Sequence, residues 1–149
     1  LEIFTDREGE IILKKYSPIG ELGIFAGQYA ESIAQTMGCL VCISDRDHII
    51  AAAGNGRKDY DGKPISQQLE SIIEERSHHV SAKNDKSFVK ITLDDRADYQ
   101  TQAISTIISE GDAIGAVILC SQEDKETSGA VQEKLVQTAA GFLGKQMEQ

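Results

Sequence analysis

Residues Thr101–Ser121 read TQAISTIISEGDAIGAVILCS, and they predict two β-strands joined by a tight turn. The hairpin turn falls at Glu110–Asp112, between the two strands. The second strand, Ala113 to Ser121, carries apolar residues on both of its faces. Both faces of such a strand are covered in the folded protein, so we expect it near the centre of a sheet.

On either side of this hairpin, the pattern of apolar residues predicts further helices and strands. Ser17 suits the N-cap of a helix, Pro18 suits its first position, and Gly38 suits its end. The expected elements are a helix over 17–37, strands over 39–43 and 48–53, a helix over 66–76, a strand over 88–93 and a helix over 127–148, capped by Thr127 or Ser128. Residues 77–86 are polar and ambiguous. Antiparallel strands with flanking helices indicate an α+β sandwich.

The first sixteen residues, LEIFTDREGEIILKKY, predict a second hairpin with its turn at Asp6–Gly9. An isolated two-stranded hairpin is only marginally stable in water, so this one needs a partner. The chain also begins at Leu1 and not at Met. We therefore expect residues 1–16 to be the end of a domain whose front part lies outside this sequence.

Residues 1–18 resemble the last hairpin of the AbrB-type swapped-hairpin DNA-binding domain of bacterial transition-state regulators. The rest of the chain resembles a family of sporulation transcription regulators, in which that domain is followed by a GAF domain. The matching segments include Ser44–Asp47, Lys58–Tyr60, Ile65–Ser66, Gly111–Asp112, Ile114–Val117, Val136, Thr138–Leu143 and Lys145–Gln149. The hairpin and the last helix match specifically, and the middle matches more loosely.

This resemblance implies two domains: the C-terminal hairpin of a DNA-binding domain over 1–16, and a GAF-like domain over 17–149 with a central antiparallel sheet flanked by helices. It also implies a homodimer or tetramer that binds DNA through the N-terminal domain. The first helix would carry the signal, because it follows the hairpin without a linker. A small metabolite that prefers one arrangement of the helices would bias the spacing of the DNA-binding heads.

The composition agrees with a cytoplasmic protein whose DNA contacts lie elsewhere. The net charge of −9 resides mostly beyond residue 16, and an acidic body is repelled by DNA phosphates. No apolar run approaches the ~20 residues that a membrane span needs. The given residues include no basic-then-apolar signal segment, although a missing front part could hold one. Three cysteines are an odd number without a pairing framework, which favours a reducing compartment.

The cysteines and histidines predict neither a metal site nor a cofactor. Cys39 and Cys42 are three residues apart on a strand and therefore face opposite sides, which favours core cysteines. A redox sensor at Cys42 or Cys120 is the alternative. The adjacent pair His78-His79 does not share a face, and we expect a solvated helix end there.

The loop from Gly54 to Tyr60 is the best candidate for a ligand site. Gly54 and Gly56 allow close backbone approach, Arg57 and Lys58 supply positive charge, and Tyr60 supplies a hydroxyl. With helix 66–76 they would form the wall of a site for a small anionic or polar metabolite. The alternative is an ordinary surface loop whose two basic residues pair with nearby acids. The other notable polar pair, Asp94-Asp95, is expected to be solvated and not catalytic.

The first and last helices are expected to hold the dimer together as a four-helix bundle. Gly141 and Gly144 lie inside the last helix, where each costs about 1 kcal/mol relative to alanine, so a packing role is plausible. The expected contact residues are Leu22, Ala26, Ile33, Leu135, Ala139, Phe142 and Leu143. The alternative is that both helices pack only on their own sheet.

Together these features predict a regulatory domain that senses a metabolite and dimerises, and not an enzyme. One alternative is a purely structural oligomerisation domain with a filled core and no ligand. A second is a cysteine-dependent methionine sulfoxide reductase, an activity that some GAF-like domains carry. The second alternative requires a reactive, partly exposed thiolate, whereas all three cysteines lie in apolar runs.

Overall fold

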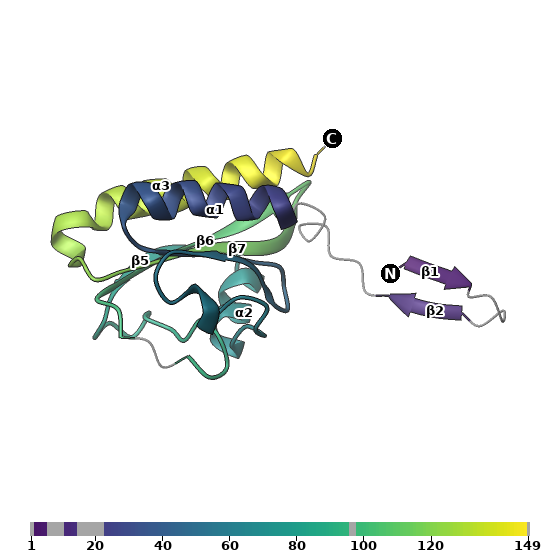
Figure 1. The fold of residues 1–149 in the computed structure, drawn as a ribbon, viewed down its shortest axis with the longest axis horizontal. Helices are drawn as coiled ribbons and strands as arrows, with labels where there is room; N and C mark the ends of the chain where they lie inside the picture. The colour runs from purple at the N-terminus through teal and green to yellow at the C-terminus, as the bar shows by residue number, and fades with distance from the viewer. Residues whose placement is uncertain (1, 6–10, 15–22, 96–97, 149) are drawn as a thin grey trace.

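The computed structural model describes residues 2–5, 11–14, 23–95 and 98–148. A two-stranded antiparallel sheet near the N-terminus pairs Ile3 with Leu13. In residues 23–95 and 98–148, the chain forms five strands, three α-helices and a short 3-10 helix (Figure 1). The elements in chain order are β1 (Glu2–Thr5), β2 (Ile11–Lys14), α1 (Gly23–Met37), β3 (Leu40–Ser44), β4 (Ile49–Ala53), η2 (Arg57–Asp59), α2 (Gln67–Glu74), β5 (His78–Ala82), β6 (Thr101–Ser109), β7 (Asp112–Ser121) and α3 (Lys125–Gln146).

The five strands form one antiparallel sheet in the order β4-β3-β7-β6-β5. The central position of β7 confirms the prediction from its two apolar faces. The β6–β7 turn places Glu110 at φ 50° and Gly111 at φ 84°. Two consecutive positive φ angles are the signature of a type I′ turn, whose twist matches that of the flanking strands.

Two apolar layers cover the two faces of this sheet. The helices α1 and α3 lie side by side over one face, and α2 covers the other (Figure 1). Along β3 the side chains alternate between the layers: Val41 and Ile43 face α1 and α3, whereas Leu40 and Cys42 face α2. The predicted α+β fold, with a central antiparallel sheet between helices, is therefore confirmed.

The helix ends follow the local sequence with one correction. Gly38 ends α1 at φ 67°, and its N–H donates to the carbonyl of Ala34 at 2.8 Å. The helix α3 begins earlier than predicted, because Asp124 is its N-cap and accepts from the Thr127 N–H at 2.7 Å. The predicted N-cap Ser17 lies outside the described residues. None of the helices in the described part of the chain is long and apolar enough to cross a membrane.

The predicted strand over 88–93 is wrong, although its apolar residues alternate. Its backbone is held by distant side chains: Gln102 accepts from the Val89 N–H at 3.0 Å and donates to the Val89 carbonyl at 2.7 Å. The Gln68 amide oxygen accepts from the Lys90 N–H at 3.1 Å. Because these side chains satisfy the backbone groups, the segment needs no neighbouring strand. The edge of the sheet is formed instead by β5, within the segment that the sequence left ambiguous.

Replacing Gln102 with leucine should lower the free energy of unfolding by about 2–4 kcal/mol. The Gln102 side chain is 1% exposed, and its loss leaves both polar groups of Val89 without a partner. Urea unfolding followed by circular dichroism measures the change. The matched control Gln68→Leu removes one bond at an exposed position and should cost less than about 1 kcal/mol. Equal losses in the two variants would contradict this explanation.

Candidate functional site

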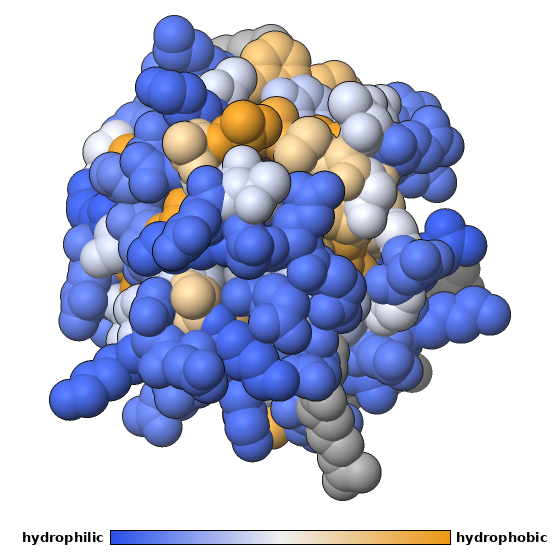
Figure 2. All heavy atoms as spheres, turned by 90° about the vertical axis from the view of Figure 1, so that its left-hand side faces the viewer, coloured by the Kyte–Doolittle hydropathy of each residue, from blue (hydrophilic) through white to orange (hydrophobic). Residues whose placement is uncertain are grey.

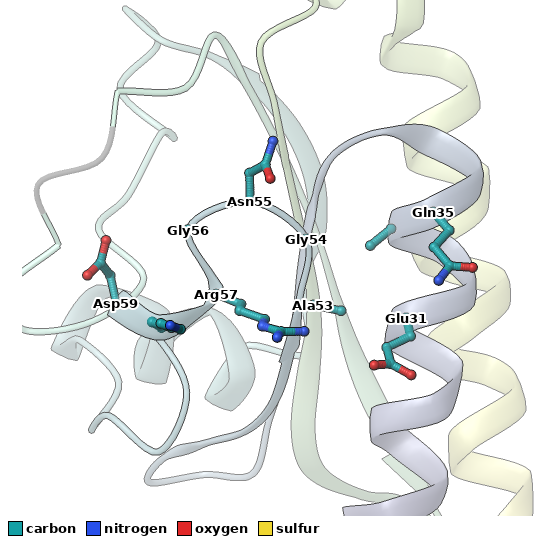
Figure 3. Close-up of a pocket in the computed structure, with 10 residues that line it drawn as sticks. Glu31, Gln35, Ala53, Gly54, Asn55, Gly56, Arg57 and Asp59 are labelled. Atoms are coloured by element: carbon teal, nitrogen blue, oxygen red, sulfur yellow. The ribbon is translucent and has the colours of Figure 1, made fainter.

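A hollow of about 670 Å³ lies between helix α1 and the loop that follows β4 (Figure 3). Strand β4 and α1 supply small residues, and the loop and α1 supply polar side chains. The lining residues are Glu31, Ala34, Gln35, Ala53, Gly54, Asn55, Gly56, Arg57, Lys58 and Asp59. Its volume falls within the range of small-molecule sites, roughly 300–1,000 Å³. Four of the five residues predicted for a ligand site, all except Tyr60, meet here.

The shape of the loop depends on Gly54, which adopts φ 100°. A Cβ atom at this position would overlap the carbonyl oxygen of Cys39, so both the angle and the close approach exclude other residues. Beyond it, the backbone turns into η2, where the N–H of Asp59 donates to the carbonyl of Gly56 at 3.0 Å. These constraints fix the start of the loop beside α1.

The polar side chains of the hollow lie on opposite walls. Arg57 extends from the loop toward α1, on which Glu31 and Gln35 stand (Figure 3). Within the described residues, the side chains of these three residues make no hydrogen bond or ion pair. The polar groups of these three side chains are therefore available to bind a ligand.

Tyr60 has a structural role on the other side of the loop. Its side chain is 2% exposed, and its hydroxyl donates to the Oδ1 atom of Asp95 at 2.7 Å. Burial is the main cause that raises the pKa of Tyr60, and the hydrogen bond that its hydroxyl donates to Asp95 adds to it. The Oδ2 atom of Asp95 accepts from the Ile91 N–H at 3.0 Å. Asp95 is therefore half-buried and joins two loops through these hydrogen bonds. The prediction that it is a solvated carboxylate is wrong.

The helix predicted to complete the wall, now α2, does not line this hollow. It lies on the opposite face of the sheet, where its buried residues Leu69 and Ile73 pack against side chains of the sheet. Ile104 and Ile118 meet them there, and all four are fully buried. Side chains therefore fill the layer beneath α2, and a ligand there would have to displace them.

Cys39, Cys42 and Cys120 are core residues, as predicted. All three thiols are free and buried, with Cys39 facing α1 and α3 and the other two facing α2. Burial raises the pKa of Cys39 to about 11, and it also raises the pKa values of Cys42 and Cys120. A raised pKa leaves very little thiolate at neutral pH, so this chain has no activated cysteine among the three.

These pKa shifts predict that the protein loses stability in alkali. The unfolded chain releases its thiol protons near pH 9, whereas the folded protein retains them to higher pH. The free energy of unfolding should hold below pH 9 and then fall by about 1.4 kcal/mol per pH unit for each thiol. Urea unfolding between pH 7 and 10.5 measures the slope. At pH 8 a thiol reagent should label the native protein slowly and the denatured protein quickly; fast labelling of native protein would contradict the prediction.

The histidine pair lies on the edge strand β5 and not at a helix end, which corrects the sequence prediction. Burial lowers the pKa of His79, and its Nε2 atom is buried without a hydrogen-bond partner. Among the residues that the structure describes, no group of three or more His, Cys, Asp or Glu side chains is placed to hold a metal ion.

The outer surface of α1 and α3 carries an aromatic cluster formed by Phe25, Tyr29 and Phe142. Phe142 stacks on Phe25 at 5.8 Å between ring centroids and on Tyr29 at 5.4 Å. Phe142 is nevertheless 39% exposed, and Val131, about three turns earlier in α3, is 57% exposed. Figure 2 shows apolar side chains gathered toward the top of its view, over the layer of the two helices. An apolar groove of about 280 Å³ runs beside the cluster and includes Leu135.

The residues predicted to contact a partner divide into two groups. Leu135 and Phe142 belong to this outer surface, and Ile33 lines the groove. In contrast, the side chains of Ala26, Ala139 and Leu143 are fully buried against the sheet of their own chain. Leu22 lies outside the described residues. Sequence periodicity identified the two helices but assigned part of their inner faces to the interface.

The fold and its layers define the class of protein. The cofactor-binding GAF domain of the nutrient sensor CodY from Clostridium difficile superposes with a TM-score of 0.57 at 12% identity, over 79% of this chain and 81% of that chain. A type II free methionine-R-sulfoxide reductase from Thermoplasma acidophilum gives 0.58 at 13% identity, over 85% and 94%. At these identities the likeness shows the fold alone, and the fold is that of a GAF domain.

Sequence comparison identifies the family. A family model described as "Stage V sporulation protein T C-terminal, transcription factor" matches residues 21–148. The chain is 46% identical to stage V sporulation protein T of Bacillus subtilis (strain 168) over 149 residues, which are 100% of this chain and 82% of that protein. The chain therefore belongs to the stage V sporulation protein T family of transcription factors, which confirms the resemblance seen in its sequence.

Proposed function

We propose that residues 17–149 form the regulatory and dimerisation domain of a sporulation transcription factor. The observation that carries the proposal is the exposed aromatic cluster on α1 and α3, which a second copy of the chain would cover. Pairing of the two-helix layers from two chains would form a four-helix bundle. Sedimentation of the whole chain tests this proposal: a dimer or tetramer is expected, and a stable monomer with native helices contradicts it.

The domain would act on DNA through the AbrB-type head, to which β1 and β2 would belong. Both the acidic body and the family favour this division. A regulator of this kind works where the chromosome lies, which places it in the cytoplasm. Residues 17–149 alone should show no operator binding at physiological salt; tight, salt-sensitive binding by this fragment would contradict the domain assignment.

The hollow beside α1 supports a second role as a metabolite sensor. Gly54, Gly56, Arg57 and Lys58 would bind a small polar or anionic ligand, and α1 would transmit its presence to the dimer. Thermal-shift screening of metabolites with wild type and an Arg57→Ala/Lys58→Ala variant tests this role. A ligand at a hundred times its dissociation constant stabilises by about 2.7 kcal/mol. If a ligand raises the melting temperature of the double variant as much as that of wild type, the loop is not the binding site.

A purely structural domain without a ligand is the second candidate. The filled layer beneath α2 favours it, because Leu69, Ile73, Ile104 and Ile118 leave no exposed surface there. Unchanged melting temperatures across the metabolite screen would support it. The reductase alternative has less support, since burial raises the pKa of every cysteine in the chain.

A further inference from the structure

The hollow beside α1 is balanced in charge, which restricts the kind of ligand that it suits. Arg57 and Lys58 are matched by two carboxylates, Glu31 and Asp59. A simple anion would be attracted by the two basic residues but repelled by the two carboxylates. A simple cation would be attracted by the carboxylates but repelled by the basic residues. A ligand that carries both charges on different atoms has a complementary partner for each.

Asp59 lies beside Lys58 on the loop side, whereas Arg57 and Glu31 come from different walls. Arg57 comes from the loop, whereas Glu31 and the amide of Gln35 come from α1 on the opposite wall (Figure 3). Arg57 and Glu31 face one another, and neither belongs to an ion pair among the described residues. The small side chains of Ala34 and Ala53 also line the hollow. A molecule placed in this gap would contact a guanidinium at one end and a carboxylate at the other.

We propose, on the basis of the sensing function above, that the ligand is a small zwitterion with a free carboxylate and a free ammonium group, as in an amino acid or a short peptide. Arg57 would bind the carboxylate, for which the planar guanidinium fork is well suited. Glu31 and the side-chain oxygen of Gln35 would accept from the ammonium group. Neither α1 residue was identified by the sequence.

This arrangement connects the ligand directly to the helix that carries the aromatic cluster. Glu31 and Tyr29 lie two residues apart and therefore on nearly opposite sides of α1. A zwitterion that joins Arg57 to Glu31 would fix one side of the helix while its other side contacts the partner copy. Binding would thus favour one position of α1 over others.

Isothermal titration calorimetry with the whole chain tests the ligand class. The probes are the twenty common L-amino acids and the dipeptides Gly-Gly and Ala-Ala, each also in N-acetylated and C-amidated form. We expect at least one free zwitterion to bind, and blocking either end to weaken binding about tenfold or more. Arg57→Ala should weaken binding to a similar degree, and Glu31→Gln should remove the preference over the acetylated form. Lys86→Ala and Glu70→Gln, outside the hollow, should have no effect.

Three results would overturn the proposal: no zwitterion binds, blocked and free forms bind equally, or Arg57→Ala and Glu31→Gln bind like wild type. Phosphate and succinate are titrated in parallel, and their binding with dependence on Arg57 would overturn the ligand class but leave sensing at this loop intact. A chain that still dimerises but binds none of the probes would remove the zwitterion. The sensor would fall as well only if the metabolite screen described above also gave no thermal shift, which would leave the structural role.

Discussion

Replacing Gly144 with alanine is expected to lower the free energy of unfolding by about 2–3 kcal/mol. Gly144 lies in α3 where the helix touches β6, and a Cβ atom there would overlap the carbonyl oxygen of Ile108. The carbonyl belongs to the backbone of β6, and the Cβ atom is fixed to the backbone of α3. The overlap can therefore be relieved only by a shift of the helix or the strand. The gain in helix propensity, about 1 kcal/mol, offsets only part of this cost. Urea unfolding followed by circular dichroism gives the difference.

Gly141 provides the matched control within the same helix. No atom lies within 4 Å of a Cβ built at this position, and the residue is exposed. Gly141→Ala should therefore raise the free energy of unfolding by about 0.5–1 kcal/mol through helix propensity alone. The same substitution three residues apart should thus have opposite signs. A neutral or stabilising Gly144→Ala variant would show that α3 does not pack on β6 as closely as the structure places it.

Replacing Phe142 with glutamate is expected to raise the dissociation constant of the dimer by about a hundredfold. Phe142 is the centre of the aromatic cluster, because it stacks on both Phe25 and Tyr29. A carboxylate there would have to lose its water when two copies meet. The monomer should keep its fold, since the Phe142 side chain is already 39% exposed. Sedimentation velocity over a dilution series measures the change.

Leu93→Glu serves as the control for this experiment. Leu93 is 63% exposed, and it lies in the segment after α2 and not on the two-helix layer. Its replacement should leave association unchanged. If Phe142→Glu associates as tightly as wild type while both variants retain native circular dichroism, the aromatic cluster is not the interface between copies.

The sequence predicts those parts of the fold that depend on local pattern. The central place of β7 follows from its apolar faces, and α2 follows from the spacing of Leu69, Ile72 and Ile73. The segment 88–93 shows where pattern fails. Its alternation is real, but its backbone binds Gln102, a side chain whose proximity only the folded structure reveals.

The sequence predicts the loop side of the candidate site but not the α1 side, because it does not show which distant residues meet in the fold. Glycine and arginine in one loop are visible in the sequence, and Gly54 and Arg57 do line the hollow. Glu31 and Gln35 gave no signal, because polar residues on the exposed side of a helix are ordinary and do not show which loop they face. Tyr60 is the converse case: its hydroxyl suggested a ligand, but its partner is Asp95, which lies 35 residues further along the chain.

The order of the strands also determines when the sheet can be completed during synthesis. Strand β3 pairs with β4 on one side, close in sequence, and with β7 on the other. At a ribosome speed of about 5–20 residues per second, β7 is made roughly 4–15 seconds after β3. During that interval the apolar edge of β3 has no native neighbour in the nascent chain. This unpaired edge is the kind of surface that invites aggregation, so the newborn protein is most vulnerable before its central strand is made.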